Sequence, residues 1–214
     1  MFHRVAFWWR SLAGGSTPSP APHRCEKCGR PARVFEYFAG REGASPDRHY
    51  CPPCAEHALW IPNATPRDAV DPMADGSAEV PVEVERIIFF SDVHPQVIVL
   101  RELDGPRAIA LITGYCEATA LWRSLKGEPS PWPMTHQVWA NSIMALGAEA
   151  RSACVLTCNE GIYFAEVRLL QGGTPVKIDV RPTDGLLLAM RAGVPFLFKE
   201  GLLRAYADTE PEPA

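Results

Sequence analysis

The sequence lacks a long hydrophobic run. In its 214 residues, no stretch approaches the roughly 18 consecutive apolar residues that a membrane-spanning helix needs. The aromatic N-terminal stretch MFHRVAFWWRSLAGG also fails as an export signal, because its apolar run from Val5 to Trp9 is shorter than the roughly 7–15 residues of such a signal. We therefore expect a cytoplasmic protein with no transmembrane segment, whose residues 1–20 form a flexible tail in preference to an interfacial membrane anchor.

The sequence also lacks an excess of positive charge. It contains 21 Lys and Arg residues against 25 Asp and Glu residues, for a formal net charge of -4. Residues 1–80 carry nine charges of each sign, whereas residues 81–214 carry 12 basic and 16 acidic side chains. Any contact with nucleic acid must therefore come from a local basic patch and not from the overall charge of the protein.

Cysteine is present in a pattern that predicts a metal site. Cys25 and Cys28 form one C-x2-C pair, Cys51 and Cys54 form a second, and 22 residues separate the pairs. Two such pairs can close a tetrahedral thiolate cage around Zn²⁺, and Gly29 suits the tight turn after the first pair. Disulfide pairing is the alternative, but it requires an oxidising compartment and no export signal is visible. A closed four-cysteine site is structural, so we expect this Zn²⁺ to stabilise a fold and to do no chemistry.

The remaining cysteines are Cys116, Cys154 and Cys158. All three are surrounded by apolar residues in the sequence, where cysteine is more often a small buried hydrophobic residue than a nucleophile. We therefore predict that all three lie in the core.

Composition divides the chain into segments. A tail over residues 1–20 is followed by a four-cysteine zinc ribbon over residues 21–60. Residues 61–79 are rich in Pro, Ala and Asp and show no sustained periodicity, which is typical of a linker. We expect the main domain to span residues 80–205 and an acidic, disordered tail to span residues 206–214.

The first half of the main domain predicts three strands and two helices. A strand alternates polar and apolar residues from Val80, and a hairpin turns at residues 104–105. An amphipathic helix follows around residues 118–125. A second helix is predicted to begin with Thr135 as its N-cap and to stop at Gly147.

The second half repeats this order of elements. The segments RSACVLTC, IYFAEVRLL and PVKIDV predict three strands, and Pro182 to Arg191 predicts a helix. The sequence therefore predicts an α+β domain built from a duplicated strand-strand-strand-helix unit, preceded by the small zinc ribbon.

The repeat aligns two acidic residues. When ITGYCEATAL is written over DVRPTDGLLL, Glu117 falls on Asp184, each near the third position of a helix that follows a strand. An acid at this position stabilises the helix start, which explains both residues without a function. The alternative is that the repeat brings two carboxylates to one seam, as a divalent-metal site or an acid–base pair requires.

Three segments of the main domain resemble the bifunctional nuclease (BFN) family of bacteria and plants. They are GYCEATAL at 114–121, PMTHQVWANSI at 133–143 and DVRPTDGLLLAMRAGVP at 179–195. The resemblance runs from about Val82 to Leu203. It implies an α+β fold with a duplicated strand-helix unit, and both DNase and RNase activity.

The resemblance also implies which residues form the site. The polar positions of the family's motifs fall on Glu117, Thr135, His136, Asn141, Arg181, Thr183 and Asp184. One position departs from the family pattern, because this chain has Gln137 where the family usually has an acid after the Thr-His pair.

Phosphodiester hydrolysis suggests a role for each of these residues. His136 would act as general base or acid, Arg181 would bind the phosphate through its planar guanidinium, and Glu117 with Asp184 would act in catalysis and hold Mg²⁺ or Mn²⁺. The remaining residues predicted to bind substrate are Thr135, Thr183 and Asn141. Structural roles are the alternatives: His136 can pack at a helix start, and Arg181 can pair with Asp184.

Two hypotheses about function follow. In the first, the protein is a nuclease that hydrolyses DNA and RNA with little sequence specificity, and the zinc ribbon recruits the nucleic acid or a protein partner. In the second, the protein is a non-catalytic oligomeric binding or regulatory module, in which the ribbon docks a protein. We expect a homodimer under either hypothesis, because predicted strands leave edges that a second subunit can cover.

Overall fold

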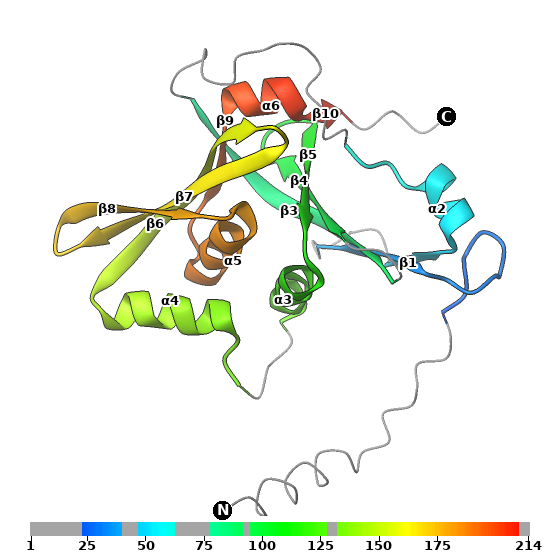
Figure 1. The fold of residues 1–214 in the computed structure, drawn as a ribbon, viewed down its shortest axis with the longest axis horizontal. Coiled ribbons are helices and arrows are strands. Elements are labelled where there is room, and N and C mark those ends of the chain that lie inside the picture. The colour runs from blue at the N-terminus through cyan, green and yellow to red at the C-terminus, as the bar shows by residue number, and fades with distance from the viewer. Residues whose placement is uncertain (1–22, 40–46, 63–77, 92–94, 128–131, 210–214) are drawn as a thin grey trace, which may run out of the picture.

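The computed structural model describes residues 23–39, 47–62, 78–91, 95–127 and 132–209 (Figure 1). The tail predicted over residues 1–20 and most of the linker predicted over residues 61–79 lie outside these ranges. None of the helices in the described ranges is long and apolar enough to cross a membrane.

The main sheet contains both predicted units. Its strand order is β10-β5-β4-β3-β9-β6-β7-β8. These strands are β3 (Glu79–Phe90), β4 (Gln96–Glu102), β5 (Arg107–Thr113), β6 (Ala148–Asn159), β7 (Ile162–Gln171), β8 (Thr174–Val180), β9 (Phe196–Lys199) and β10 (Asp208–Thr209). In each unit, three consecutive strands pair antiparallel, β3-β4-β5 in the first and β6-β7-β8 in the second. The predicted α+β fold with a duplicated unit is confirmed.

Strand β9 joins the two units. It pairs antiparallel with β3 and parallel with β6, so the first strand of each unit flanks it. Neither β9 nor β10 is predicted by the sequence, because short strands carry too few residues to show an alternating pattern. β10 also corrects the predicted tail: Tyr206 is buried, and Asp208–Thr209 pair with β5.

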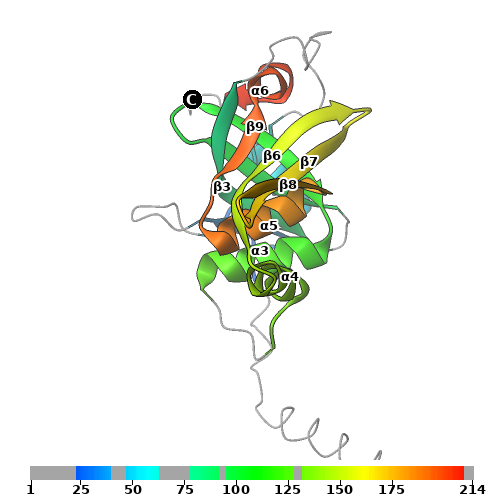
Figure 2. The same cartoon turned by 90° about the vertical axis from the view of Figure 1, so that its left-hand side faces the viewer.

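Four helices of the described ranges accompany the strands of the main domain. They are α3 (Tyr115–Lys126), α4 (Thr135–Ala145), α5 (Pro182–Ala192) and α6 (Glu200–Tyr206). Both views show α3, α4 and α5 gathered at one end of the molecule and α6 at the other (Figures 1 and 2). This grouping matters for function, because the predicted site residues lie on α3, α4 and α5 or at their starts.

Helix α5 packs closely on the sheet. Leu186 and Leu188 are each 2% exposed, which explains the almost wholly apolar sequence after Asp184. Gly185 makes the close approach possible: a Cβ atom there would lie 3.2 Å from Val180 Cγ2 and 3.3 Å from Ala153 Cβ. The tight packing fixes the start of α5, and with it Asp184, relative to β6.

The cysteine-rich segment joins the same sheet. Its elements are β1 (Val34–Phe38), β2 (Arg48–Tyr50) and α2 (Pro52–Ala58). β1 pairs antiparallel with β2 and with the C-terminal half of β3, in the register Val34↔Phe90 to Phe38↔Arg86. The cysteine-rich segment and the main domain therefore share one continuous sheet.

This segment also covers one face of the first unit. Val97 and Val99 of β4 pack in a cluster with Val34 and Tyr50 of the cysteine-rich segment. Alternate residues of β4, such as Ile98, instead face the core beneath the helices. Strand β4 is therefore buried on both faces, which explains why its sequence VIVL over residues 97–100 is continuously apolar and does not alternate.

Two local predictions are wrong. Met134, and not Thr135, is the N-cap of α4, and the Gln137 side chain accepts a hydrogen bond of 3.0 Å from the Met134 N–H. A Gln at the third position of a helix can accept a hydrogen bond from the N–H of the N-cap residue, as the corresponding residue of a capping box does. Cys116 is exposed because it lies on the solvent side of α3, whereas Cys154 and Cys158 are buried as predicted.

Candidate functional site

The four predicted metal ligands come together. The Sγ atoms of Cys25, Cys28, Cys51 and Cys54 all lie within 4.8 Å of one another. In a tetrahedral site with Zn–S bonds of about 2.3 Å, the sulfur atoms are roughly 3.8 Å apart, so the cluster fits such an ion. Gly29 has a φ of 72° and donates its N–H to the Cys25 carbonyl, which forms the tight turn that the sequence predicts.

Hydrogen bonds shift the pKa values of the cysteine thiols in opposite directions, and the thiolate is the form that binds metal. Arg30 Nε lies 3.3 Å from Cys28 Sγ, and this hydrogen bond lowers the pKa of the Cys28 thiol to about 6. Hydrogen bonding to Cys51 raises the pKa of the Cys54 thiol to about 12. The Cys54 thiol would therefore lose its proton when a metal ion binds. Among the described residues, no other group of His, Cys, Asp and Glu side chains is close enough to hold a metal ion in this way.

A second cluster joins three helix starts. His136 Nε2 of α4 lies 3.0 Å from Asp184 Oδ1 of α5. Arg181, the N-cap of α5, donates to both Asp184 oxygens, at 2.7 Å from Nε and 3.0 Å from Nη2. Arg181 Nη2 also lies 3.1 Å from Glu117 Oε1 of α3. Glu117, His136, Arg181 and Asp184 therefore form one connected polar cluster, as a shared site requires.

The local sequence explains why these side chains meet. Glu117 and Asp184 each occupy the third position of their helix, and His136 the second position of α4. Helix starts carry the positive end of the helix dipole and free N–H groups, so carboxylates are stabilised there. Because α3 and α4 both contact α5, three such starts converge on one surface. The structural and functional alternatives for Asp184 are thus compatible, since a residue that starts a helix also bonds to His136.

Hydrogen bonding keeps Asp184 ionised. Burial alone would raise the pKa of its carboxyl, but hydrogen bonds from Arg181 and His136 outweigh burial and hold the pKa below its ordinary value. An ionised carboxylate only accepts hydrogen bonds, so His136 must donate from Nε2. In the neutral imidazole this leaves Nδ1 with the lone pair. His136 is therefore oriented and set in one tautomer by Asp184.

A small pocket of about 60 Å³ lies beside His136 and carries two basic residues that the sequence analysis missed. Arg123 and Arg191 line it together with His136 and Gln137. Both arginines are exposed, and neither forms an ion pair with any residue of the described ranges. In the sequence, each is only a basic residue in the last turn of a helix, where it complements the helix dipole. Their convergence on His136 is visible only in the folded protein.

The cluster does not fit a divalent cation in this arrangement. Glu117 and Asp184 both form ion pairs with the guanidinium of Arg181, whose positive charge would repel a cation held between the two carboxylates. A bound Mg²⁺ or Mn²⁺ would have to displace Arg181, and the Glu117–Asp184 pair lacks a further carboxylate among the described residues to complete a site.

The other predicted substrate-binding residues are not part of the cluster. Thr135 is exposed at the first position of α4, and Asn141 is exposed further along α4. With about 3.6 residues per turn, Asn141 points to a different side of the helix from His136. Thr183 is 7% exposed and lies in the interior behind Asp184.

The chain matches the family model described as the bifunctional nuclease domain over residues 98–210, which is more than half of its length. The chain belongs to this family. Two uncharacterized proteins of Mycobacterium tuberculosis, one from strain CDC 1551 / Oshkosh and one from strain ATCC 25618 / H37Rv, are each 31% identical to it over 107 residues. The aligned region covers 50% of this chain and 63% of each relative, so the chain spans less than two thirds of their length.

The bifunctional nuclease domain match includes the polar cluster and excludes the cysteine cluster. It begins in β4 and ends just after β10, so Glu117, His136, Arg181 and Asp184 all lie inside it. All four cysteines lie before it. The polar cluster therefore lies within the region that matches the bifunctional nuclease family model, whereas the cysteine cluster lies outside that region.

Proposed function

We propose that this bifunctional nuclease domain protein hydrolyses phosphodiester bonds of DNA and RNA with little sequence specificity. The observation that carries the proposal is the hydrogen bond of 3.0 Å between His136 and Asp184, next to three arginines on an otherwise acidic protein. An acid–base group beside phosphate-binding cations is the minimum that this reaction needs.

The charges of the cluster favour an anionic substrate. Glu117 and Asp184 contribute two negative charges, whereas Arg181, Arg123 and Arg191 contribute three positive charges, so positive charge is in excess. Arg123 and Arg191 have no carboxylate partner in the described ranges and are available to a phosphate. This is the local basic patch that the acidic composition requires of a nucleic-acid-binding protein.

In the proposed reaction, His136 acts as the general base. Its Nδ1 takes a proton from the attacking water while the water oxygen forms a bond to phosphorus and the bond from phosphorus to the leaving oxygen breaks. The protonated imidazole is stabilised by Asp184, and it later returns the proton to the leaving oxygen. Arg123 and Arg191 stabilise the additional negative charge on the phosphate oxygens. No step requires a divalent cation.

We further propose that the cysteine cluster holds a structural Zn²⁺ ion. Its four sulfur ligands leave no open coordination position for a substrate. The cluster holds together the segment that covers one face of β4, so the ion would stabilise the main domain through that cover. The ranges 21–60 and 80–205 are proposed as the two units of the protein. A homodimer, and a protein partner for the cysteine-rich segment, stay predictions.

The test is a cleavage assay on single-stranded and duplex DNA and RNA. The wild type is compared with His136→Gln and Asp184→Asn, each shown to be folded and metal-loaded. Because loss of the general base typically lowers the rate about 10²- to 10⁴-fold, both variants should fall into this range. Val138→Ala is a matched control, because Val138 is exposed on the same helix and should keep wild-type activity.

Metal dependence is measured in buffer freed of divalent ions and then with added Mg²⁺ or Mn²⁺. A chelator is avoided because it would also remove Zn²⁺ from the cysteine cluster. Cleavage that His136→Gln leaves unchanged contradicts the proposed mechanism. If the folded, metal-loaded wild type cleaves none of the four substrates, the nuclease proposal fails and the alternative of a non-catalytic binding module is favoured.

A further inference from the structure

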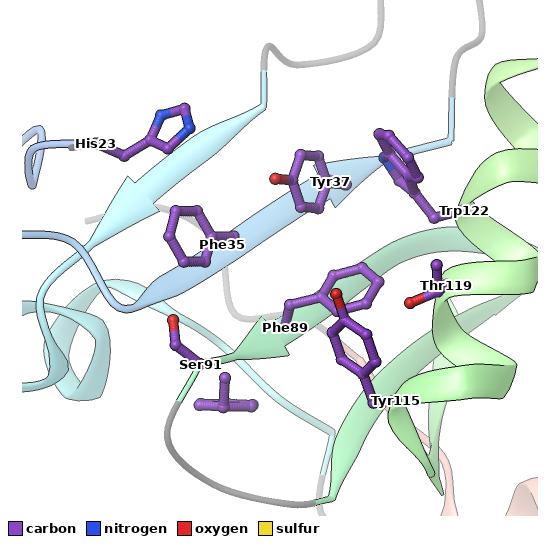
Figure 3. Close-up of a pocket in the computed structure, with 9 residues that line it drawn as sticks. His23, Phe35, Tyr37, Phe89, Ser91, Tyr115, Thr119 and Trp122 are labelled. Carbon is purple, nitrogen blue, oxygen red and sulfur yellow. The ribbon is translucent and has the colours of Figure 1, made fainter. Parts of the chain in front are cut away.

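An aromatic pocket of about 620 Å³ lies between the cysteine-rich segment and the main domain. Side chains from β1, β3 and α3 surround it (Figure 3). Its lining consists of Phe35, Tyr37, Phe89, Phe90, Tyr115, Trp122, His23, Ser91 and Thr119. A volume of this size lies within the range of about 300–1,000 Å³ that is typical of small-molecule sites.

None of the aromatic rings that line this pocket is buried. Tyr115 is 55% exposed, and Phe35, Tyr37, Phe89 and Trp122 are all partly exposed. Rings of this size normally dominate the core, so a partly exposed group of them indicates a binding surface. The rings support one another edge to face, with centroids 5.6 Å apart for Tyr37 and Phe89 and 5.9 Å apart for Phe89 and Tyr115. These contacts between rings hold the lining side chains in place, and the interior of the pocket stays open.

The lining of the pocket also contains polar groups that a ligand can reach. His23 and Ser91 are exposed, and Tyr115, whose side chain ends in a hydroxyl group, is 55% exposed. These groups can hydrogen-bond to a ligand with a polar edge.

Helix α3 connects this pocket to the polar cluster. Tyr115, Thr119 and Trp122 follow the spacing i, i+4 and i+7, so they share one face of the helix. Glu117 lies on the opposite face and bonds to Arg181. In Figure 1, α3 stands between β1 on one side and α5 on the other. The pocket and the polar cluster are therefore separated by the thickness of one helix, about 10 Å.

We propose that the aromatic pocket stacks a base of single-stranded DNA or RNA whose neighbouring phosphate lies at the polar cluster. This inference rests on the proposed function, because the strand is the substrate of that site. A base offers two flat faces for ring stacking and a polar edge for the hydrogen-bonding groups in the wall. Every base has such a face, so this mode of binding suits an enzyme with little sequence specificity. A duplex would have to open before a base could enter.

The pocket chemistry favours a base over a charged ligand. Its lining contains no Lys, Arg, Asp or Glu side chain. The phosphate groups of the strand are instead matched by Arg181 and Arg191 of the α5 region and by Arg123 on the flank of α3. Bases and phosphates of one strand would thus be bound by separate surfaces that differ in charge.

Binding to two labelled oligonucleotides tests this inference. Both are single-stranded and of equal length; one carries bases and the other consists of abasic nucleotides, so they differ only in what can stack. The fluorescence anisotropy of the label is measured with the His136→Gln variant. This substitution prevents cleavage without a chelator, so a metal ion in the cysteine cluster stays in its site. Because stacking of one base strengthens binding about 5- to 150-fold, the oligonucleotide with bases should bind more tightly by such a factor.

Variants of the pocket should remove this preference. Phe35→Ala and Tyr115→Ala each reduce binding of the base-containing strand about 5-fold or more and leave the abasic strand unaffected, whereas Tyr115→Phe keeps the ring and the preference. Phe164→Ala is the matched control, because Phe164 is a 50% exposed ring on β7 that does not line the pocket.

The outcomes separate this inference from the nuclease proposal. Equal binding of both strands, absence of binding to either, or pocket variants that behave like Phe164→Ala would each overturn the stacking inference. A base preference that the pocket variants abolish supports it, even if the wild-type protein cleaves no substrate. In that case the nuclease proposal alone would fail.

Discussion

His136 Nε2 and Asp184 Oδ1 lie 3.0 Å apart although 48 residues separate them in the sequence. Asp184 also accepts two hydrogen bonds from Arg181, so its carboxylate is oriented from both sides. This is the geometry in which a carboxylate fixes the tautomer of a catalytic histidine. Asp184 therefore serves the start of α5 and the polar cluster at once.

Arg123 and Arg191, which line the small pocket beside His136, should bind the phosphate groups of the substrate. We expect Arg123→Gln and Arg191→Gln each to raise KM with a smaller effect on kcat, because a phosphate contact contributes mainly to binding. Each substitution should also reduce the slope of log affinity against log salt concentration by about one. Arg151→Gln, at an exposed residue of β6 paired with Glu149, should change neither quantity. Equal effects of all three substitutions would argue against a phosphate site beside His136.

Gly114 should be needed for the position of Glu117. A Cβ atom at residue 114 would lie 2.7 Å from Glu117 Oε2, and the flexible carboxylate is what must move. Glu117 pairs with Arg181 in the polar cluster, so we expect Glu117→Gln to lower activity. We expect Gly114→Ala to release Glu117 from Arg181 and to lower activity to a similar extent, while the free energy of unfolding changes by about 1 kcal/mol or less. Activity of both variants and their urea unfolding curves check this. A Gly114→Ala protein that keeps full activity while Glu117→Gln loses it would contradict the expectation.

Glu79 should make stability depend on acid pH. Its carboxylate accepts hydrogen bonds from Arg168 of β7, at 2.7 Å to each oxygen, and from Lys199 of β9 at 2.9 Å. The Arg168 hydrogen bonds lower the pKa of Glu79 to about 2 from an ordinary value of 4.5. Because the folded-state pKa is lowered, this stabilisation is complete above about pH 4.5 and is lost as the pH falls toward 2.

Urea unfolding at neutral and acid pH measures this contribution. At pH 7, Glu79→Gln should lower the free energy of unfolding by on the order of 1–2 kcal/mol after allowance for solvent screening. The difference between wild type and variant should shrink steadily below pH 4.5. A difference that is the same at pH 7 and pH 3 would exclude the ion pair as its source.

Removal of Zn²⁺ should destabilise the main domain as well as the cysteine-rich segment. Val97 and Val99 of β4 pack against that segment, so its unfolding would expose them to water. We expect chelation, or Cys51→Ser, to lower Tm by roughly 5 °C or more and to increase the binding of a hydrophobic dye. Metal analysis confirms that the ion has been removed. An unchanged Tm in metal-free protein would refute a structural role for the ion.

Local patterns in the sequence were sufficient to predict most helices and strands of the fold. The two runs of three strands and the apolar α5 follow from alternation, turn residues and Pro182, which act over a few neighbouring residues. The start of α4 was predicted one residue late because the cap depends on the Gln137 side chain and not on Thr135. Strand β9 was missed because its pairing with β3 and β6 comes from tertiary contact and not from its own short sequence.

The sequence by itself determined the four-cysteine cluster and the helix-start positions of Glu117, His136 and Asp184, because short spacings and helix ends constrain the chain locally. Only the tertiary structure decided how these parts meet. It brings His136 to Asp184, places Arg123 and Arg191 around one pocket with His136, and joins β1 to the edge of β3. Residues far apart in sequence become neighbours only through the packing of α3, α4 and α5 on the sheet, and no local pattern records which faces will touch.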